Sequence, residues 1–263
     1  MDATFQWMHD PLEGVSERGT IVTGIGRDKV PPLFERVLEA AVAAVESADV
    51  SLYVYGSVAT GMARIGVSDV DLLTIGLAAN EAASIAQDLS ERFAGLCRGV
   101  EVAAANASDF EGDRDEVYGG RVFLRHYCVH LSGSDLRSSL PEFSADTRAA
   151  RCFNGDIAQH VETWRGQLGE GRDPGDLGRR VARKSLLAVA GLVSVHDGTW
   201  TTDRRFAAAR WSEINPALAA DLETFTAWSS GDRTANEQAV SAALGGAVAE
   251  IASAFERTIG LWN

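Results

Sequence analysis

Positive charge is scarce in this amino-acid sequence. The 263 residues include 24 lysines and arginines against 37 aspartates and glutamates, which gives a formal net charge of −13 at pH 7. Affinity for a polyanion comes mostly from Lys and Arg side chains that displace counterions. The composition therefore makes nucleic acid an unfavoured partner, and it argues equally against docking on an anionic membrane surface.

Cysteines and long apolar runs are scarce as well. The three cysteines, Cys97, Cys128 and Cys152, are widely spaced and odd in number. This excludes a disulfide framework and a CxxC metal pair, and it favours a reducing cytoplasm. No apolar run reaches the roughly 18–20 residues of a membrane helix. The opening MDATFQWMHDPLEG lacks the basic start and apolar stretch of a signal peptide, so we expect a cytoplasmic globular protein.

Hydrophobic periodicity predicts different structure in the two halves of the chain. Residues 1–30 show no clear period and are expected to form an irregular arm or short strands. The predicted strands and helices that follow are strands 51–55, 68–76 and 99–106 and helices 32–47 and 80–96. Residues 107–116 are predicted to be loop, and 121–133 alternate like a strand, although one helical turn also fits. The remaining predicted helices are 145–152, 155–168, 177–195, 203–211, 216–228 and 234–261. This pattern indicates an α/β domain over residues 1–150 and an all-helical domain over 151–263, with the boundary near 145–155.

Two aspartates in the second strand carry the first chemical signal. Asp69 and Asp71 are two residues apart, so their carboxylates leave the same face of a strand, while Val70 and Leu72 pack on the other. Carboxylates held this close repel each other unless a cation lies between them. Mg²⁺ prefers hard oxygen ligands and takes others from substrate phosphates. The alternative is a strand end with two solvated aspartates.

Gly56 and Ser57 directly follow the first strand. Glycine lets the backbone approach a ligand closely, and the Ser57 hydroxyl with nearby N–H groups can hold phosphate oxygens. Glu101 adds a third carboxylate inside a short apolar strand, where it is costly unless it faces a cation or a polar site. If that strand neighbours the Asp71 strand, Glu101 can act as a base or help to bind a metal. The alternative for Glu101 is a salt-bridged edge residue.

The remaining charged residues allow two interpretations each. One predicted helix carries Lys184 and three arginines, Arg179, Arg180 and Arg183; Lys184 adjoins an apolar run, and its cation could offset charge on a triphosphate. The same cluster fits a solvated helix face. The acids of 109–116 are most simply solvated, or they line a pocket for a cationic acceptor. His126, Cys128 and His130 would share one strand face, but a fourth zinc ligand is not visible in the sequence.

The order of these motifs resembles a known superfamily. GS, a spacer, D-x-D and a later strand carboxylate are similar to polymerase-β-type nucleotidyltransferases. LYVYGSVATG, SDVDLL, RGVEV and the tail ARKSLLAVAGLVSVHDGTW more closely resemble bacterial aminoglycoside (streptomycin/spectinomycin) adenylyltransferases. The resemblance covers about residues 33–230. The family's longer, Trp-containing insert is replaced here by the short segment 107–120, which has no Trp.

This resemblance implies a nucleotidyltransferase domain with a small mixed sheet, followed by the helical domain. It implies that Asp69 and Asp71 bind Mg²⁺, that Ser57 and Ser68 contact ATP, and that Glu101 is the base. Arg204 and Arg205 stand where the family has a Ser-Lys nucleotide contact. The expected reaction transfers AMP from ATP to a small hydroxylated acceptor, such as an aminoglycoside, by a monomer or weak homodimer. Two alternatives stay open: a regulatory or toxin–antitoxin nucleotidyltransferase that modifies a protein or tRNA, and a non-catalytic nucleotide-binding module.

Overall fold

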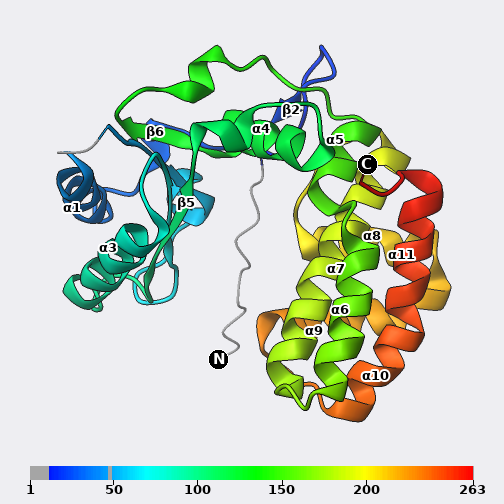
Figure 1. Cartoon of the computed structure of the whole chain (residues 1–263). Coiled ribbons are helices and arrows are strands. Elements are labelled where there is room, and N and C mark those ends of the chain that lie inside the picture. Colours follow the sequence, from blue (N-terminus) through cyan, green and yellow to red (C-terminus); the bar gives the residue numbers. More distant parts are fainter. Residues whose placement is uncertain (1–11, 47–48, 263) are drawn as a thin grey trace, which may run out of the picture. The chain divides into compact units, whose positions relative to one another are not determined.

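The computed structural model describes residues 12–46 and 49–262, which form two compact units. The sheet unit comprises residues 12–13, Val22–Asp113 and Gly120–Phe143. The helical unit comprises Gly14–Ile21, Arg114–Gly119 and the residues from Ser144 onward. The domain boundary predicted at residue 150 falls inside a helix, Thr147–Asn154, and remains a prediction. Each unit is described below by itself (Figure 1).

A small mixed sheet organises the sheet unit, as the family resemblance implies. Its four strands lie in the order β5, β4, β3, β6, with bounds Val100–Ala105, Val70–Ile75, Ser51–Tyr55 and Val129–Ser132. Strand β3 is antiparallel to β4 and to β6, whereas β4 and β5 are parallel. The predicted strands 51–55, 68–76 and 99–106 are therefore confirmed to within two residues at each end.

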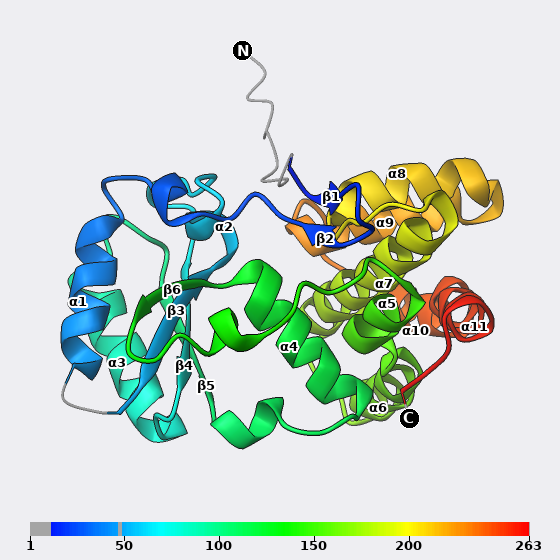
Figure 2. The same ribbon diagram turned by 90° about the horizontal axis from the view of Figure 1, so that it is seen from above.

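The two faces of the sheet are covered differently (Figures 1 and 2). Helices α1 (Glu35–Val45) and α3 (Ala79–Arg92) lie on one face, where alternate residues such as Val70 and Leu72 are fully buried. Helix α4 (Asp115–Tyr127) contributes Leu124 to the other core, with Tyr53 and Leu73 of the sheet. Because strand side chains alternate, the odd-numbered residues of β4, Asp71 among them, lie on this second face.

Short elements complete the sheet unit and the start of the chain. They are strands β1 (Gly14–Val15) and β2 (Ile21–Val22), helix α2 (Gly56–Ala59), and the 3-10 turns η1 (Arg27–Lys29), η2 (Ala107–Phe110) and η3 (Leu136–Ser139). The two short strands pair with each other. They confirm the expectation of an irregular segment with short strands for the described part of residues 1–30.

A central helix organises the helical unit. Helix α7 (Pro174–Asp197) contacts six others: α5 (Thr147–Asn154), α6 (Ile157–Gly169), α8 (Arg204–Ile214), α9 (Ala219–Ser230), α10 (Glu237–Gly245) and α11 (Ala247–Thr258). A 3-10 turn, η4 (Pro216–Leu218), joins α8 to α9. Figure 1 shows α7 surrounded within this unit. Leu177, Leu186 and Leu192 of α7 are fully buried, which explains the apolar run that the sequence shows there.

The prediction for residues 107–133 was wrong in part. The predicted loop ends where α4 begins at Asp115, and the helix continues to Tyr127 before strand β6 begins at Val129. Val122, Leu124 and His126 are buried at alternate positions of this helix, so its pattern imitates a strand. His126, Cys128 and His130 consequently do not share a strand face. The His126 Nε2 instead accepts a hydrogen bond from the Phe143 N–H, at 2.9 Å.

The predicted helix 234–261 is two helices. The break falls at Gly246, next to Gly245, where two consecutive glycines weaken a helix. Within the described residues, Glu237–Thr258 is the one segment long and apolar enough to cross a membrane. That is weak support for a membrane span, because core helices pass the same test. Val240, Val248, Ile251 and Phe255 are fully buried within the protein.

Candidate active site

Two carboxylates meet on neighbouring strands of the sheet. Strands β4 and β5 are parallel, and Asp71 is the register partner of Glu101. Register partners on adjacent strands project from the same face of a sheet. Asp69, two residues earlier, precedes β4 directly. The chain therefore places Glu101 on the same side of the sheet as Asp71, as the predicted site requires.

The environment of Asp71 is short of positive charge. Burial, and after it the negative charges of Glu101 and Asp69, raise the pKa of Asp71 from 3.8 to about 6, while Arg98 opposes them. A carboxyl group responds in this way when its ionised form lacks a sufficient partner. Glu101 itself is exposed. The cluster thus has an unmet demand for a cation beside an accessible carboxylate.

Asp69 already has a cationic partner, and sequence reasoning missed it. The Arg98 Nε donates a hydrogen bond to Asp69 Oδ1 at 3.0 Å, and the Arg98 Nη2 contacts Asp69 Oδ2. Arg98 stands three residues before Glu101 in the motif RGVEV. Its place just before Glu101 is the one sequence feature that could have pointed to this ion pair. It does so only once β4 and β5 are known to be adjacent strands.

Gly56 is held against the Asp71 carboxylate. It follows the last residue of β3 with φ +69°, in the left-handed region that favours glycine. A Cβ atom at Gly56 would lie 2.5 Å from Asp71 Oδ2. The backbone at Gly56 therefore approaches the carboxylate more closely than any other residue type allows.

The two predicted serines have different surroundings. Ser57 is half-buried in α2, and its hydroxyl makes no hydrogen bond within the described part of the chain. Ser68 is buried, and its Oγ accepts a hydrogen bond from the Arg64 N–H at 2.9 Å. Ser68 thus closes the turn that leads into β4, whereas the Ser57 hydroxyl is available to a ligand.

The side chains of the cluster have the chemistry to bind a hard divalent cation, but in the described residues they are not arranged as a metal site. Asp69, Asp71 and Glu101 offer carboxylate oxygens, the ligands that Mg²⁺ prefers. Within residues 12–46 and 49–262, however, no group of three His, Cys, Asp or Glu side chains is arranged to hold a metal. Asp69 is instead paired with Arg98, and Asp71 and Glu101 are register partners on the strand pair.

The predicted nucleotide contacts Lys184, Arg204 and Arg205 belong to the helical unit. Lys184 Nζ lies 2.6 Å from Asp156 Oδ1 and donates a hydrogen bond to the Phe153 carbonyl at 3.2 Å. Its charge is therefore already compensated. His160 contacts the other oxygen of the same aspartate, at 2.9 Å.

Arg204 differs from Lys184 in having no such compensation. Its guanidinium forms no hydrogen bond or ion pair within the described residues, and burial, with the nearby Arg183 charge, lowers the pKa of Arg204. Asp203, which precedes it, is occupied in capping α8: its Oδ1 accepts from the Arg205 and Phe206 N–H groups, each at 2.8 Å. Burial also lowers the pKa of Arg205, which lies 3.9 Å from Asp232.

One of the acids assigned to a solvated loop has a structural role. Asp115 is 1% exposed, and its Oδ2 accepts a hydrogen bond from Arg151 Nε at 2.7 Å, with Arg148 Nε 3.8 Å from the other oxygen. The expectation that Asp115 is solvated was wrong, because the segment is the first turn of α4. Asp115 is accordingly not available to a cationic acceptor.

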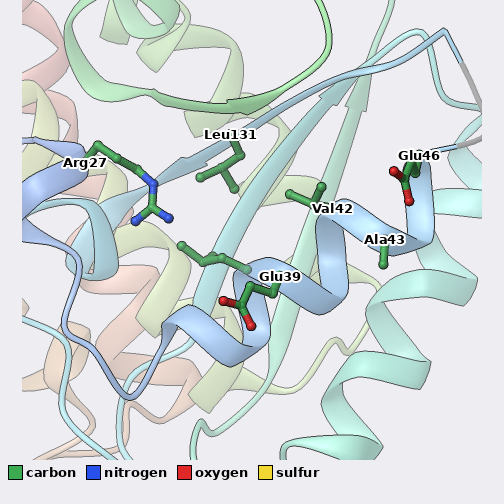
Figure 3. Close-up of a pocket in the computed structure, with 7 residues that line it drawn as sticks. Arg27, Glu39, Val42, Ala43, Glu46 and Leu131 are labelled. Atoms are coloured by element: carbon green, nitrogen blue, oxygen red, sulfur yellow. The ribbon is translucent and has the colours of Figure 1, made fainter.

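An open groove of about 290 Å³ lies elsewhere on the sheet unit (Figure 3). It is lined by Arg27 and Leu131 and by a row of α1 residues, Leu38, Glu39, Val42, Ala43 and Glu46. Leu38, Val42 and Leu131 belong to the core on the α1 side of the sheet. The groove therefore opens on the face opposite Asp71 and is not part of the carboxylate cluster.

Comparison with known proteins bears on this cluster. No curated protein matches the sequence. Residues 35–119 match the family model of the nucleotidyltransferase domain. The matched range contains Gly56, Ser57, Asp69, Asp71 and Glu101, and it supports the polymerase-β-type superfamily. The segment that matches this family model thus carries all three carboxylates of the candidate site.

Proposed function

We propose that this protein is a Mg²⁺-dependent nucleotidyltransferase that transfers AMP from ATP to a hydroxyl of a small molecule. The observation that carries the proposal is the register pairing of Asp71 with Glu101, beside the close approach of Gly56. Asp71, Glu101 and a released Asp69 would hold the metal. When bound, Mg²⁺ supplies positive charge to the triphosphate and to the leaving pyrophosphate.

The chain's own groups have separate tasks in this reaction. The exposed Glu101 carboxylate takes the proton from the acceptor hydroxyl as the oxygen attacks the α-phosphorus. The bond from that phosphorus to the β-phosphate oxygen breaks, and pyrophosphate leaves with the electron pair. The Ser57 hydroxyl, which makes no hydrogen bond within the described residues, donates to a phosphate oxygen. The backbone at Gly56 leaves room for that approach.

Three of the proposed nucleotide contacts belong to the helical unit. Lys184, Arg204 and Arg205 remain proposed contacts of the triphosphate. Of these, Arg204 is the best supported, since its guanidinium has no ion pair within the described chain and burial lowers its pKa. Lys184 is the least available, because Asp156 lies 2.6 Å from its amine.

The acceptor class follows from charge. A protein with a net charge of −13 attracts cations and repels polyanions, which favours a polyamine-like hydroxylated molecule. Because the motifs also resemble aminoglycoside adenylyltransferases, we propose an aminoglycoside antibiotic as the acceptor and antibiotic resistance as the consequence. The same charge disfavours tRNA. Three buried free thiols, Cys97, Cys128 and Cys152, fit a reducing cytoplasm, and a monomer or weak homodimer remains part of the proposal.

Pyrophosphate release tests the proposal. The protein is incubated with ATP, Mg²⁺ and a panel of aminoglycosides, and the products are identified by mass spectrometry. We expect acceptor-dependent pyrophosphate with the wild type and none with Asp71→Asn. Asp88→Asn, an exposed change on α3, is the matched control and should keep full activity.

Three results would redirect the proposal. Turnover by Asp71→Asn at the wild-type rate would refute the role of the carboxylate cluster. AMP found on a protein, with no small-molecule product, would favour the regulatory or toxin–antitoxin alternative. ATP binding without pyrophosphate release from any acceptor would favour a non-catalytic module.

A further inference from the structure

The turn before β5 brings a guanidinium to the carboxylate cluster. The Arg98 N–H donates to the Ser68 carbonyl, and the Val70 N–H donates to the Gly99 carbonyl, both at 3.0 Å. These two backbone hydrogen bonds fix residues 98–99 beside 68–70. Arg98 is therefore held next to Asp69 by the sheet itself and not only by its side chain.

The side-chain contact uses both oxygens of Asp69. Arg98 Nε donates to Oδ1 at 3.0 Å, and Nη2 contacts Oδ2. This fork is the strongest geometry in which an arginine binds a carboxylate. Asp69 is only 16% exposed while Arg98 is 67% exposed. The aspartate is thus fixed at the site, and the arginine is the partner that can leave toward solvent.

The pairing bears on how the three carboxylates are arranged. Three carboxylates are close in the fold, yet no three of the described metal-binding side chains form a ready group. With Asp69 engaged, only Asp71 and Glu101 remain together on the strand pair. Release of Asp69 from Arg98 would bring the third carboxylate into use.

We propose that Arg98 is an internal counter-ion that competes with the divalent cation for Asp69. The inference rests on the proposed function, because it concerns the metal of that same site. Arg98 stabilises the cluster while it holds no metal, and it lowers the affinity for the free cation. Arg98 is a regulator of metal binding here and not a catalytic residue.

Direct cation binding tests this without any turnover. Mn²⁺ is titrated into the full-length protein in the absence of nucleotide, and bound and free metal are separated by electron paramagnetic resonance. Arg98→Met keeps the side-chain length but removes the charge and the fork. We expect it to bind Mn²⁺ about fivefold more tightly than wild type, since a single unit charge at a partly exposed site changes affinity by this order. The gap should shrink at high salt, which screens the repulsion.

Two variants separate charge from other effects. Arg98→Lys keeps the charge and should bind Mn²⁺ more like wild type than Arg98→Met does. Arg36→Met, at an exposed arginine on α1, should bind as wild type. In a metal chelator, Arg98→Met should also melt at a lower temperature than Arg36→Met, because the carboxylates then repel without a counter-ion.

The outcomes distinguish this inference from the proposed function. Equal or weaker Mn²⁺ binding by Arg98→Met, with wild-type binding intact and lost in Asp71→Asn, would overturn the competition by Arg98 and leave the metal site standing. Absence of Mn²⁺ binding in every variant, wild type included, would overturn both.

Discussion

Gly56 offers the sharpest test of the site, because its two constraints can be separated. Gly56→Ala places a side chain on a residue with φ +69° and puts its Cβ 2.5 Å from Asp71 Oδ2. Gly66 has the same φ, +69°, but a Cβ there would meet nothing within 4 Å. Gly66→Ala is therefore a matched control that carries the backbone strain without the clash.

The expected magnitudes follow from these distances. The left-handed backbone costs an alanine about 1–2 kcal/mol, so both variants should lose this much free energy of unfolding. For a protein of this size each kcal/mol corresponds to about 2–4 °C in Tm. Only Gly56→Ala forces the Asp71 carboxylate to move. A displacement of a reacting group by about 1 Å can lower the rate about 100-fold, and we expect that loss in kcat/KM.

The assay compares the two variants on the same preparation. Thermal unfolding measures the strain, and acceptor-dependent pyrophosphate release measures the site. The reasoning is refuted if Gly56→Ala and Gly66→Ala show equal activity, since the clash with Asp71 would then have no consequence. A Tm loss confined to Gly56→Ala would instead show that the backbone conformation is not the source of the strain.

Three further predictions concern single ionisable groups. Since folding raises the pKa of Asp71 from 3.8 to about 6, the folded state binds more protons than the unfolded state between these pH values, and stability falls as the pH rises through that window. In a chelator, Asp71→Asn should lack this fall and melt above wild type at pH 7; a scan of Tm from pH 4 to 8 measures it, and parallel curves would contradict it. Lys184→Met should lower the free energy of unfolding by about 2 kcal/mol, because it removes the partner 2.6 Å from Asp156 Oδ1 and leaves only His160 at the other oxygen. Arg204→Met should leave Tm unchanged and raise the KM for ATP. If Lys184→Met raised this KM and Arg204→Met lowered Tm instead, Lys184 would be the nucleotide contact and Arg204 the structural residue.

The strands of the site could be predicted because their sequences alternate over short, bounded runs. Val70 and Leu72 are buried on one face while Asp71 lies on the other, which is the pattern that the sequence shows. The prediction that Glu101 lies beside Asp71 depended on their two strands being neighbours in the sheet. Nothing in residues 68–76 or 99–106 states that pairing, and only the parallel register of β4 and β5 supplies it.

Helix α4 was mispredicted for a physical reason. Its buried residues alternate at Val122, Leu124 and His126, as they would on a strand. This alternation imitates the period of a strand and hides the helical pattern. The split of the last helix is the milder case: the apolar stripe through Val240 and Val248 is continuous and buried, and only the two glycines at 245–246 mark the break.

Arg98 shows where a residue-by-residue interpretation of charge stops. The aspartates at 69 and 71 predicted a cation between them from their mutual repulsion alone. The structure supplies part of that cation from the protein, at a residue 29 positions away from Asp69. A guanidinium satisfies one carboxylate and leaves Asp71 with a raised pKa of about 6. The positive charge that the sequence predicts beside the aspartates is thus supplied by the described part of the chain only at Asp69. Asp71 and Glu101 have no comparable cationic partner among the described residues, which is why we expect a divalent cation to bind there.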